Sequence, residues 1–236
     1  MSPTDPGGPV VQRALLARSA STHRFVDRPH PTTRGWLHLA AAVVAVPGAA
    51  VWTALAPPGR PRLAVAAFAW GIAAMFTGSA LLHLRRWSVV VTERLVRVDH
   101  TGIYLAIAGT GVALALLGFD GDTGRVLLVV AVAGAALGII AEWLPFAPPR
   151  GFSNTVYLTL GWVPVVLLPW LVRSSGWGTV ALLLGGGVAY TVGAIVVGLQ
   201  RPDPVPGRFG YHELFHLLVI VAVALHTVMF ADLLAG

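Results

Sequence analysis

The sequence predicts an all-α integral membrane protein, a bundle of seven transmembrane helices with a cytoplasmic N-terminus and an external C-terminus. Three observations predict this class: the composition, the spacing of the apolar runs and the distribution of arginine. The chain has 236 residues, of which 56% are hydrophobic and only 11% charged, and its mean hydropathy is +0.76. A soluble domain usually carries about a quarter charged residues. This chain therefore has too little polar surface to face water on all sides.

The first 34 residues differ from the rest, because they are rich in proline and arginine and poor in apolar residues. No continuous apolar stretch follows an early basic start, so this region is not a signal peptide. We interpret residues 1–34 as a flexible cytoplasmic tail and residues 35–236 as the seven-helix membrane domain.

Seven apolar runs follow, each close to the roughly 20 residues that cross a bilayer. Backbone polar groups find no partner in lipid, so each run is predicted to be a helix. Glycine, proline and charged residues separate the runs. The predicted helices are 36–55, 63–84, 101–118, 126–144, 155–172, 179–199 and 212–234.

The arginines decide the orientation. All 16 basic residues are arginine, and with the N-terminus inside only four of them fall in external segments. The other twelve face the cytoplasm, as the positive-inside rule requires. The formal charge of +6 does not indicate a nucleic-acid partner, because the arginines lie in short segments between apolar runs rather than along one face. We predict a multi-pass protein of the cell membrane whose partners are membrane lipids.

Ionisable residues at membrane helices are costly to place and often functional. The predicted topology brings four of them to the cytoplasmic face. His83 ends the second run, Asp99 precedes the third, and His212 and His216 begin the seventh. Residues far apart in the chain are thus expected at a similar depth.

These residues suit a metal site. His212 and His216 are four apart, so their side chains lie about 40° apart around a helix and about 6 Å along it. With His83 they supply three imidazoles and leave a fourth position open, which is the catalytic zinc arrangement. The chain has no cysteine, so zinc would be held without thiolates. Asp99 could act as a general base or acid toward water there, and Ser79, one turn before His83, could hydrogen-bond a ligand or a substrate carbonyl.

Each of these residues has a structural alternative. A histidine at a helix end is often only an interfacial residue, Ser79 could serve helix packing, and Asp99 could cap a helix. His100 points about 100° away from Asp99 and is left out of the site. His226 lies too far along its helix and is assigned to packing or the outer interface, while His38 offers only a weak contribution.

Residues 212–216 also match the H-E-x-x-H signature of zinc proteases. Only His226 and Asp232 follow as further ligands, and both lie too far along the same helix. Glu213 is about 100° from His212 and is predicted to point sideways, toward a neighbour or the headgroup layer. An intramembrane metalloprotease is therefore the least favoured function.

A family resemblance covers about residues 28–230. The stretches "RPHPTTRGWLH", "SALLH", "VDHTGIYLAIAGT", "YLTLGW", "GGGVAYTVGAI" and "RPDPVPGRFGYHELFH" occur in this order. They resemble motifs of the hemolysin III-like proteins, the bacterial branch of the progestin and adipoQ receptor family. The sequence departs from that pattern at "TGVALAL" after "AGT", away from the candidate ligands.

The resemblance implies a seven-helix fold in a bacterial plasma membrane, with zinc near the inner leaflet. The ligands would correspond to His83, His212 and His216, with Asp99 contacting the ion through water and Ser79 alongside. The adiponectin receptors and alkaline ceramidases share this constellation, which implies hydrolysis of lipid amides such as ceramide.

Two functional hypotheses remain open at this stage. The first is a zinc-dependent hydrolase that acts on a lipid amide or ester. The alternative is a non-catalytic membrane sensor or regulator, or a cytolysin, in which zinc is structural. Nothing in the sequence indicates an oligomeric state.

Overall fold

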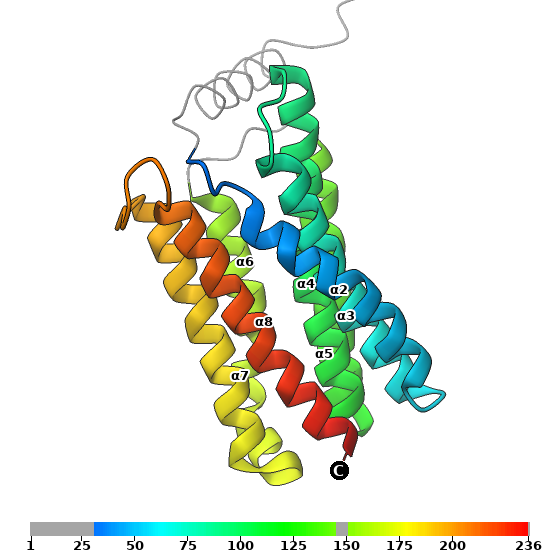
Figure 1. The fold of residues 1–236 in the computed structure, drawn as a ribbon. Coiled ribbons are helices and arrows are strands. Elements are labelled where there is room, and N and C mark those ends of the chain that lie inside the picture. The colour runs from blue at the N-terminus through cyan, green and yellow to red at the C-terminus, as the bar shows by residue number, and fades with distance from the viewer. Residues whose placement is uncertain (1–30, 145–150, 236) are drawn as a thin grey trace, which may run out of the picture.

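The computed structural model describes residues 31–144 and 151–235, and all regular structure within them is helical. The described parts contain no named strand, and only an isolated bridge joins Val205 and Phe209. Figure 1 shows long helices packed side by side. In chain order they are α2 (Trp36–Leu55), α3 (Arg60–His83), α4 (Val89–Leu117), α5 (Gly121–Trp143), α6 (Phe152–Trp162), the 3-10 helix η1 (Val163–Leu167), α7 (Leu168–Leu199) and α8 (Tyr211–Ala235).

The protein is a helical membrane bundle. Among the described residues, six helical segments are long and apolar enough to cross a membrane. Five of them are α2, α3, α4, α5 and α8, and the sixth joins α6, η1 and α7 over Phe152–Leu199. Within this sixth segment Gly176 has φ 80° and ψ 175°, a conformation that only glycine adopts readily. Figure 1 shows the chain turning back at the lower end of the bundle, between α6 and most of α7.

Two predicted helix boundaries differ from the observed ones for local reasons. The helix expected to start at residue 101 begins at Val89, so the stretch 89–100 before the apolar run is also helical. The Ser88 hydroxyl caps this earlier start by accepting a hydrogen bond from the Val91 N–H. The helix expected over 155–172 is interrupted by η1, which contains Pro164. Proline lacks the N–H that an α-helical hydrogen bond requires.

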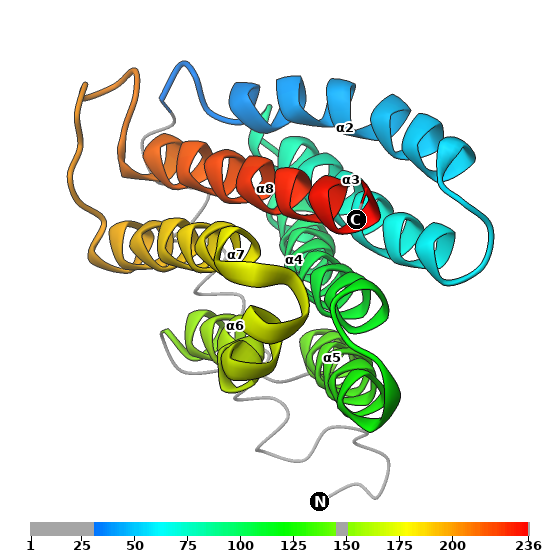
Figure 2. The same ribbon diagram turned by 90° about the horizontal axis from the view of Figure 1, so that it is seen from below.

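Helix α3 lies inside the bundle and packs closely on α4. A Cβ atom added to Gly109 of α4 would lie 2.2 Å from the Ala67 carbonyl oxygen, and one added to Gly71 would lie 2.5 Å from the Leu105 carbonyl oxygen. Small residues thus bring the two backbones together, as is common in membrane helix pairs. Helix α2, by contrast, lies at the edge of the bundle beside α3 and α8 (Figure 2).

The segment just before α2 ties this edge helix to the start of α8. The Thr32 and Thr33 N–H groups donate to the Gly207 and Arg208 carbonyl oxygens over 3.2 and 3.4 Å. Gly35 has φ 82°, and a Cβ there would lie 2.8 Å from the His83 carbonyl carbon. Of the tail predicted over residues 1–34, Thr32, Thr33 and Arg34 are therefore hydrogen-bonded to the rest of the protein. Residues 1–30 lie outside the described part of the chain.

Candidate metal centre

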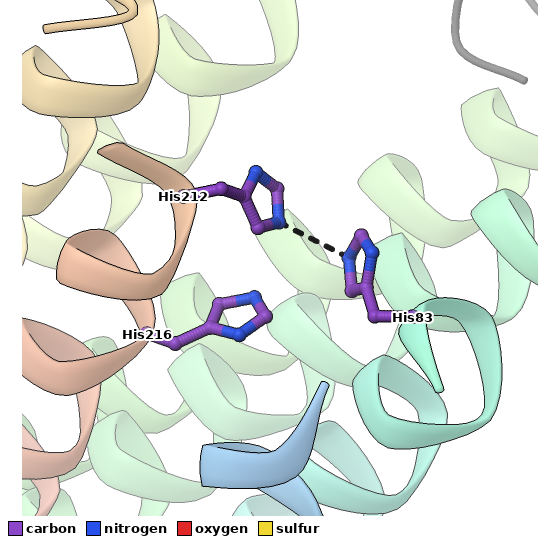
Figure 3. Close-up of side chains that lie close together, drawn as sticks. All are labelled: His83, His212 and His216. Atoms are coloured by element: carbon purple, nitrogen blue, oxygen red, sulfur yellow. Dashed lines mark hydrogen bonds between the residues drawn. The ribbon is translucent and has the colours of Figure 1, made fainter. Parts of the chain in front are cut away.

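Three histidines from two helices meet at one end of the bundle. His83 is the last residue of α3, while His212 and His216 lie in the first turns of α8. Figure 3 shows the three rings pointing toward one another. The His83 and His212 Nε2 atoms are 3.2 Å apart, and one nitrogen from each ring lies within 4.8 Å of the others. The His83 and His216 ring centroids are 5.2 Å apart, so the three predicted ligands are together and could hold a metal ion.

The donor set fits zinc. Two nitrogens bound to one tetrahedral zinc ion are about 3.4 Å apart, close to the His83–His212 spacing. His83 and His216 are 3% and 1% exposed, and the buried His216 Nδ1 has no hydrogen-bond partner among the described residues. Leaving such an atom unpaired costs about 1–3 kcal/mol. A metal site gives a reason for gathering imidazoles where few polar partners exist.

Glu213 stabilises the helix start that carries two of the histidines. Its Oε2 accepts a hydrogen bond from the Gly210 N–H at 2.9 Å, which satisfies a backbone donor ahead of α8. Its Oε1 lies 2.5 Å from the Arg34 Nε, and the two side chains are 1% and 10% exposed. The prediction that Glu213 points sideways toward a neighbour is confirmed. Both carboxylate oxygens have protein partners, which disfavours the protease role of this glutamate.

Asp99 and Ser79 lie beside the histidines. The Asp99 Oδ2 is 4.0 Å from the His83 Nε2, and the Asp99 side chain is 14% exposed. Ser79 is buried one turn before His83, and its hydroxyl lies within hydrogen-bonding reach of Asp99. All five residues singled out from the sequence therefore share one site.

A cavity of about 250 Å³ opens from this site into the bundle. Its polar end includes Ser79, Asp99 and His212, and its walls are formed mainly by apolar side chains of α4 to α8. Its lining also includes Leu127 of α5 and His226, ten residues along α8 from His216. None of the described residues that line it is arginine. A long apolar chain with one uncharged polar end suits such a cavity.

His38 lies directly against the site, although the sequence predicted only a weak contribution from it. Its ring stacks on that of His216, with centroids 3.7 Å apart and planes 15° apart. It is 2% exposed and lines the cavity. The available signal was its place near the cytoplasmic start of the first predicted helix, at the same depth as His216.

Sequence reasoning also missed a second polar cluster in the cavity wall. The His100 Nδ1 lies 3.2 Å from the Glu142 Oε2, and Glu142 is 8% exposed. His100 and Tyr157 both line the cavity, and their ring centroids are 6.0 Å apart. A signal was available, because Glu142 is the single acidic residue within an otherwise apolar run over 126–144.

His226 is buried farther along α8 and contacts a backbone carbonyl group. It is 5% exposed, and its Nε2 lies 3.3 Å from the Leu183 carbonyl oxygen. Its expected distance from the three clustered histidines is confirmed, because it is not one of their group.

The sequence matches a known protein family over most of its length. A sequence model of the family described as "Haemolysin-III related" matches residues 26–227. The matched stretch includes every residue of the candidate site.

Curated relatives agree with the family match. "Hemolysin-3" of Bacillus cereus is 29% identical over 187 residues, which covers 78% of this chain and 82% of that protein. "Hemolysin-3 homolog" of Bacillus subtilis (strain 168) is 30% identical over 123 residues, or 52% of this chain and 55% of that one. "Adiponectin receptor protein" of Drosophila melanogaster is 25% identical over 236 residues, covering 91% of this chain and 53% of its own length.

Proposed function

Because the chain belongs to the haemolysin-III related family, we propose that it is a zinc-binding membrane protein that hydrolyses a lipid amide or ester at the cytoplasmic side of a bacterial plasma membrane. One observation carries this proposal. Three clustered histidines, with a carboxylate and a hydroxyl beside them, lie at the polar end of an apolar cavity inside a membrane bundle.

The proposed topology has seven crossings. A single helix of 48 residues would be about 72 Å long, more than twice the roughly 30 Å of a bilayer's hydrocarbon core. Phe152–Leu199 has this length and contains the non-helical Gly176. Two crossings, one on each side of Gly176, account for both facts.

The proposed orientation places the histidine end in the cytoplasm. Seven described arginines belong to that end of the bundle and four to the other, in agreement with the positive-inside rule. At the histidine end they are Arg34, Arg85, Arg86, Arg94, Arg97, Arg201 and Arg208; at the opposite end they are Arg60, Arg62, Arg125 and Arg173.

In this proposal His83, His212 and His216 hold the ion. Zinc supplies a Lewis acid that polarises a carbonyl and makes water more acidic. Asp99 takes a proton from the attacking water and returns it to the leaving nitrogen or oxygen. The water oxygen joins the carbonyl carbon, the C–N or C–O bond breaks, and a fatty acid and an amine or alcohol result. Ser79 holds the Asp99 carboxylate in place for both proton transfers.

The cavity supports a lipid as the substrate. Its apolar walls would take an acyl chain, and each methylene removed from water contributes about 0.8 kcal/mol. The scissile carbonyl would then sit at the polar end, beside Asp99 and His212. Binding energy from the chain would hold the carbonyl in a reactive position.

The test is lipid hydrolysis by purified protein with its metal content measured in parallel. Wild type and Asp99→Asn are offered a panel of long-chain amides and esters, and Asp232→Asn, exposed near the end of α8, is the control. We expect Asp99→Asn to keep its zinc and to lose at least about 100-fold in turnover, as for loss of a general acid–base group. Equal turnover in wild type and Asp99→Asn, or none for any lipid offered, counts against the proposal.

A second candidate is a non-catalytic protein in which the ion joins α3 to α8. It is favoured by the position of His83, which reaches across from another helix to the pair on α8. In that case His212→Ala lowers the melting temperature in detergent and abolishes no reaction.

A further inference from the structure

His226 holds a buried hydrogen-bond acceptor that no described residue uses. Its Nε2 lies 3.3 Å from the Leu183 carbonyl oxygen, and a carbonyl oxygen only accepts, so Nε2 carries the proton. The side chain is 5% exposed, and burying a charge without a partner is costly, so the ring is neutral. In a neutral imidazole the other nitrogen, Nδ1, is then the acceptor. This Nδ1 is buried and has no hydrogen-bond partner among the described residues.

The ring of His226 is oriented with Nδ1 away from α7, the helix that lies beside α8 (Figure 2). A Cβ atom added to Gly186 would lie 2.3 Å from the His226 Nε2 and 2.5 Å from its Cδ2, so this edge of the ring faces the α7 backbone. Nδ1 is the atom opposite that edge in the five-membered ring. It therefore lies on the side of the ring away from Gly186.

Packing alone does not explain a histidine at this position. Leu183 lies within α7, where its carbonyl group accepts an intrahelical hydrogen bond and does not depend on His226 for a partner. A leucine or a phenylalanine at position 226 would fill the space without burying an unpaired nitrogen. The unpaired Nδ1 therefore indicates a hydrogen-bond donor that comes from a bound molecule.

His226 lines the same cavity as the candidate metal centre. It lies ten residues along α8 from His216, which corresponds to about 15 Å. Tyr190 lines the cavity as well, with its ring centroid 5.9 Å from that of His226, and a phenolic hydroxyl can donate or accept. Asp99 is the one acidic side chain among the described lining residues, and it belongs to the metal end. An uncharged donor therefore suits the surroundings of His226 better than an ammonium group.

We propose that His226 forms a second polar subsite of the cavity, which accepts a hydrogen bond from a hydroxyl group on the chain of the bound molecule. The substrate class is then a long-chain carbonyl compound with a hydroxyl about 15 Å from its carbonyl group. With C–C bonds of about 1.5 Å, an extended chain covers this distance in about eleven or twelve bonds. This inference rests on the proposed function and deepens it, since it names the substrate class of the same cavity.

The test measures binding of methyl ketones, which have a carbonyl group but no leaving group and are therefore not hydrolysed. Tridecan-2-one is compared with 13-hydroxytridecan-2-one, whose hydroxyl lies at the far end of the chain, and with 6-hydroxytridecan-2-one, whose hydroxyl falls short of His226. Dissociation constants are measured by calorimetry in detergent for wild type, His226→Phe and the control Thr227→Val. Thr227 donates to the Val223 carbonyl oxygen of its own helix and is not among the described residues that line the cavity.

The ratio of two dissociation constants isolates the hydrogen bond. Phenylalanine at position 226 keeps a ring and removes the acceptor, and a change of cavity shape acts on chains with and without the hydroxyl. We expect the constant of the 13-hydroxy ketone, divided by that of tridecan-2-one, to rise about tenfold in His226→Phe, because the buried hydroxyl loses its acceptor. The ratio should stay within about twofold of wild type in Thr227→Val, and so should the ratio for the 6-hydroxy ketone in every variant.

Three results overturn the subsite: an unchanged ratio in His226→Phe, an equal rise in Thr227→Val, or wild-type protein that binds none of the three ketones. If His226→Phe does not fold, His226→Gln and His226→Met give the same decision, because they match in size and only glutamine keeps a strong acceptor. The ratio is then expected to be higher in the methionine variant, and equal ratios in the pair overturn the proposal.

Binding is measured without turnover, so this inference and the proposed function fail separately. A tenfold rise in a protein that hydrolyses no lipid supports the subsite and counts against the hydrolase. Lipid hydrolysis together with an unchanged ratio overturns the role of His226 alone.

Discussion

Replacing Glu213 by glutamine distinguishes a structural from a catalytic role for the acidic residue of the H-E-x-x-H stretch. In the structure Glu213 forms a buried ion pair with Arg34 at 2.5 Å and accepts the Gly210 N–H at 2.9 Å. Glutamine keeps an acceptor for Gly210 and removes the negative charge. The Arg34 guanidinium, 10% exposed, is then left without its counter-charge.

The expected loss follows from this burial. Removing one partner of a buried ion pair costs about 3–5 kcal/mol. Because the Gly210 hydrogen bond survives, we expect the lower value, about 3 kcal/mol. For a chain of this size that corresponds to a melting temperature lower by about 6–12 °C.

The assay is thermal unfolding in detergent, with zinc content measured on the same samples. Asp122→Asn is the matched control, because Asp122 pairs with Arg125 at 3.1 Å while both side chains are 80–90% exposed. Exposed pairs contribute little, so the control should melt within about 2 °C of wild type. In the double variant Arg34→Gln with Glu213→Gln, the loss should be smaller than the sum of the two single losses, since no unpaired charge remains.

One result would refute this reasoning. If Glu213→Gln melts like Asp122→Asn, keeps its zinc and loses hydrolysis, then Glu213 acts as the base of a protease-like site. The Arg34 pair would in that case be an incidental contact.

Two further predictions concern the bundle itself. Gly109→Ala should lower the melting temperature, because its Cβ would lie 2.2 Å from the Ala67 carbonyl oxygen and overpacking costs about 1–3 kcal/mol. The control Gly48→Ala, with no atom within 4 Å of its Cβ, should melt at or slightly above the wild-type temperature. Equal losses in the two variants would contradict the close contact of α3 and α4. Because the chain has no cysteine, Arg173→Cys and Arg201→Cys each give a single labelling site. A membrane-impermeant maleimide should reach residue 173 from outside the cell and residue 201 only from the cytoplasm. Labelling of both residues from the same side would exclude the seven crossings.

The sequence predicted those parts of the site that depend on helix geometry and depth. His212 and His216 were expected on one face because they are four residues apart in a helix. His83 and Asp99 were expected beside them because each lies at the cytoplasmic end of a predicted span. The structure brings all four together with Ser79.

The parts that the sequence did not predict depend on contacts between distant segments. Arg34 and Glu213 are 179 residues apart in the chain, and nothing in the local pattern of either residue names its partner. The stack of His38 on His216 depends on how the edge helix α2 leans against α8, which hydrophobic periodicity does not determine. The pair of His100 with Glu142 likewise depends on the rotation of α4 against α5.

The most direct test of the central claim is the metal content of purified protein. Elemental analysis is made of wild type, His83→Ala and the control His226→Ala, which removes a buried histidine outside the metal group. The predicted result is about one zinc ion per chain in wild type and His226→Ala, and a large loss in His83→Ala. Wild-type protein without metal, or equal zinc in His83→Ala and wild type, would contradict a metal centre built by these histidines.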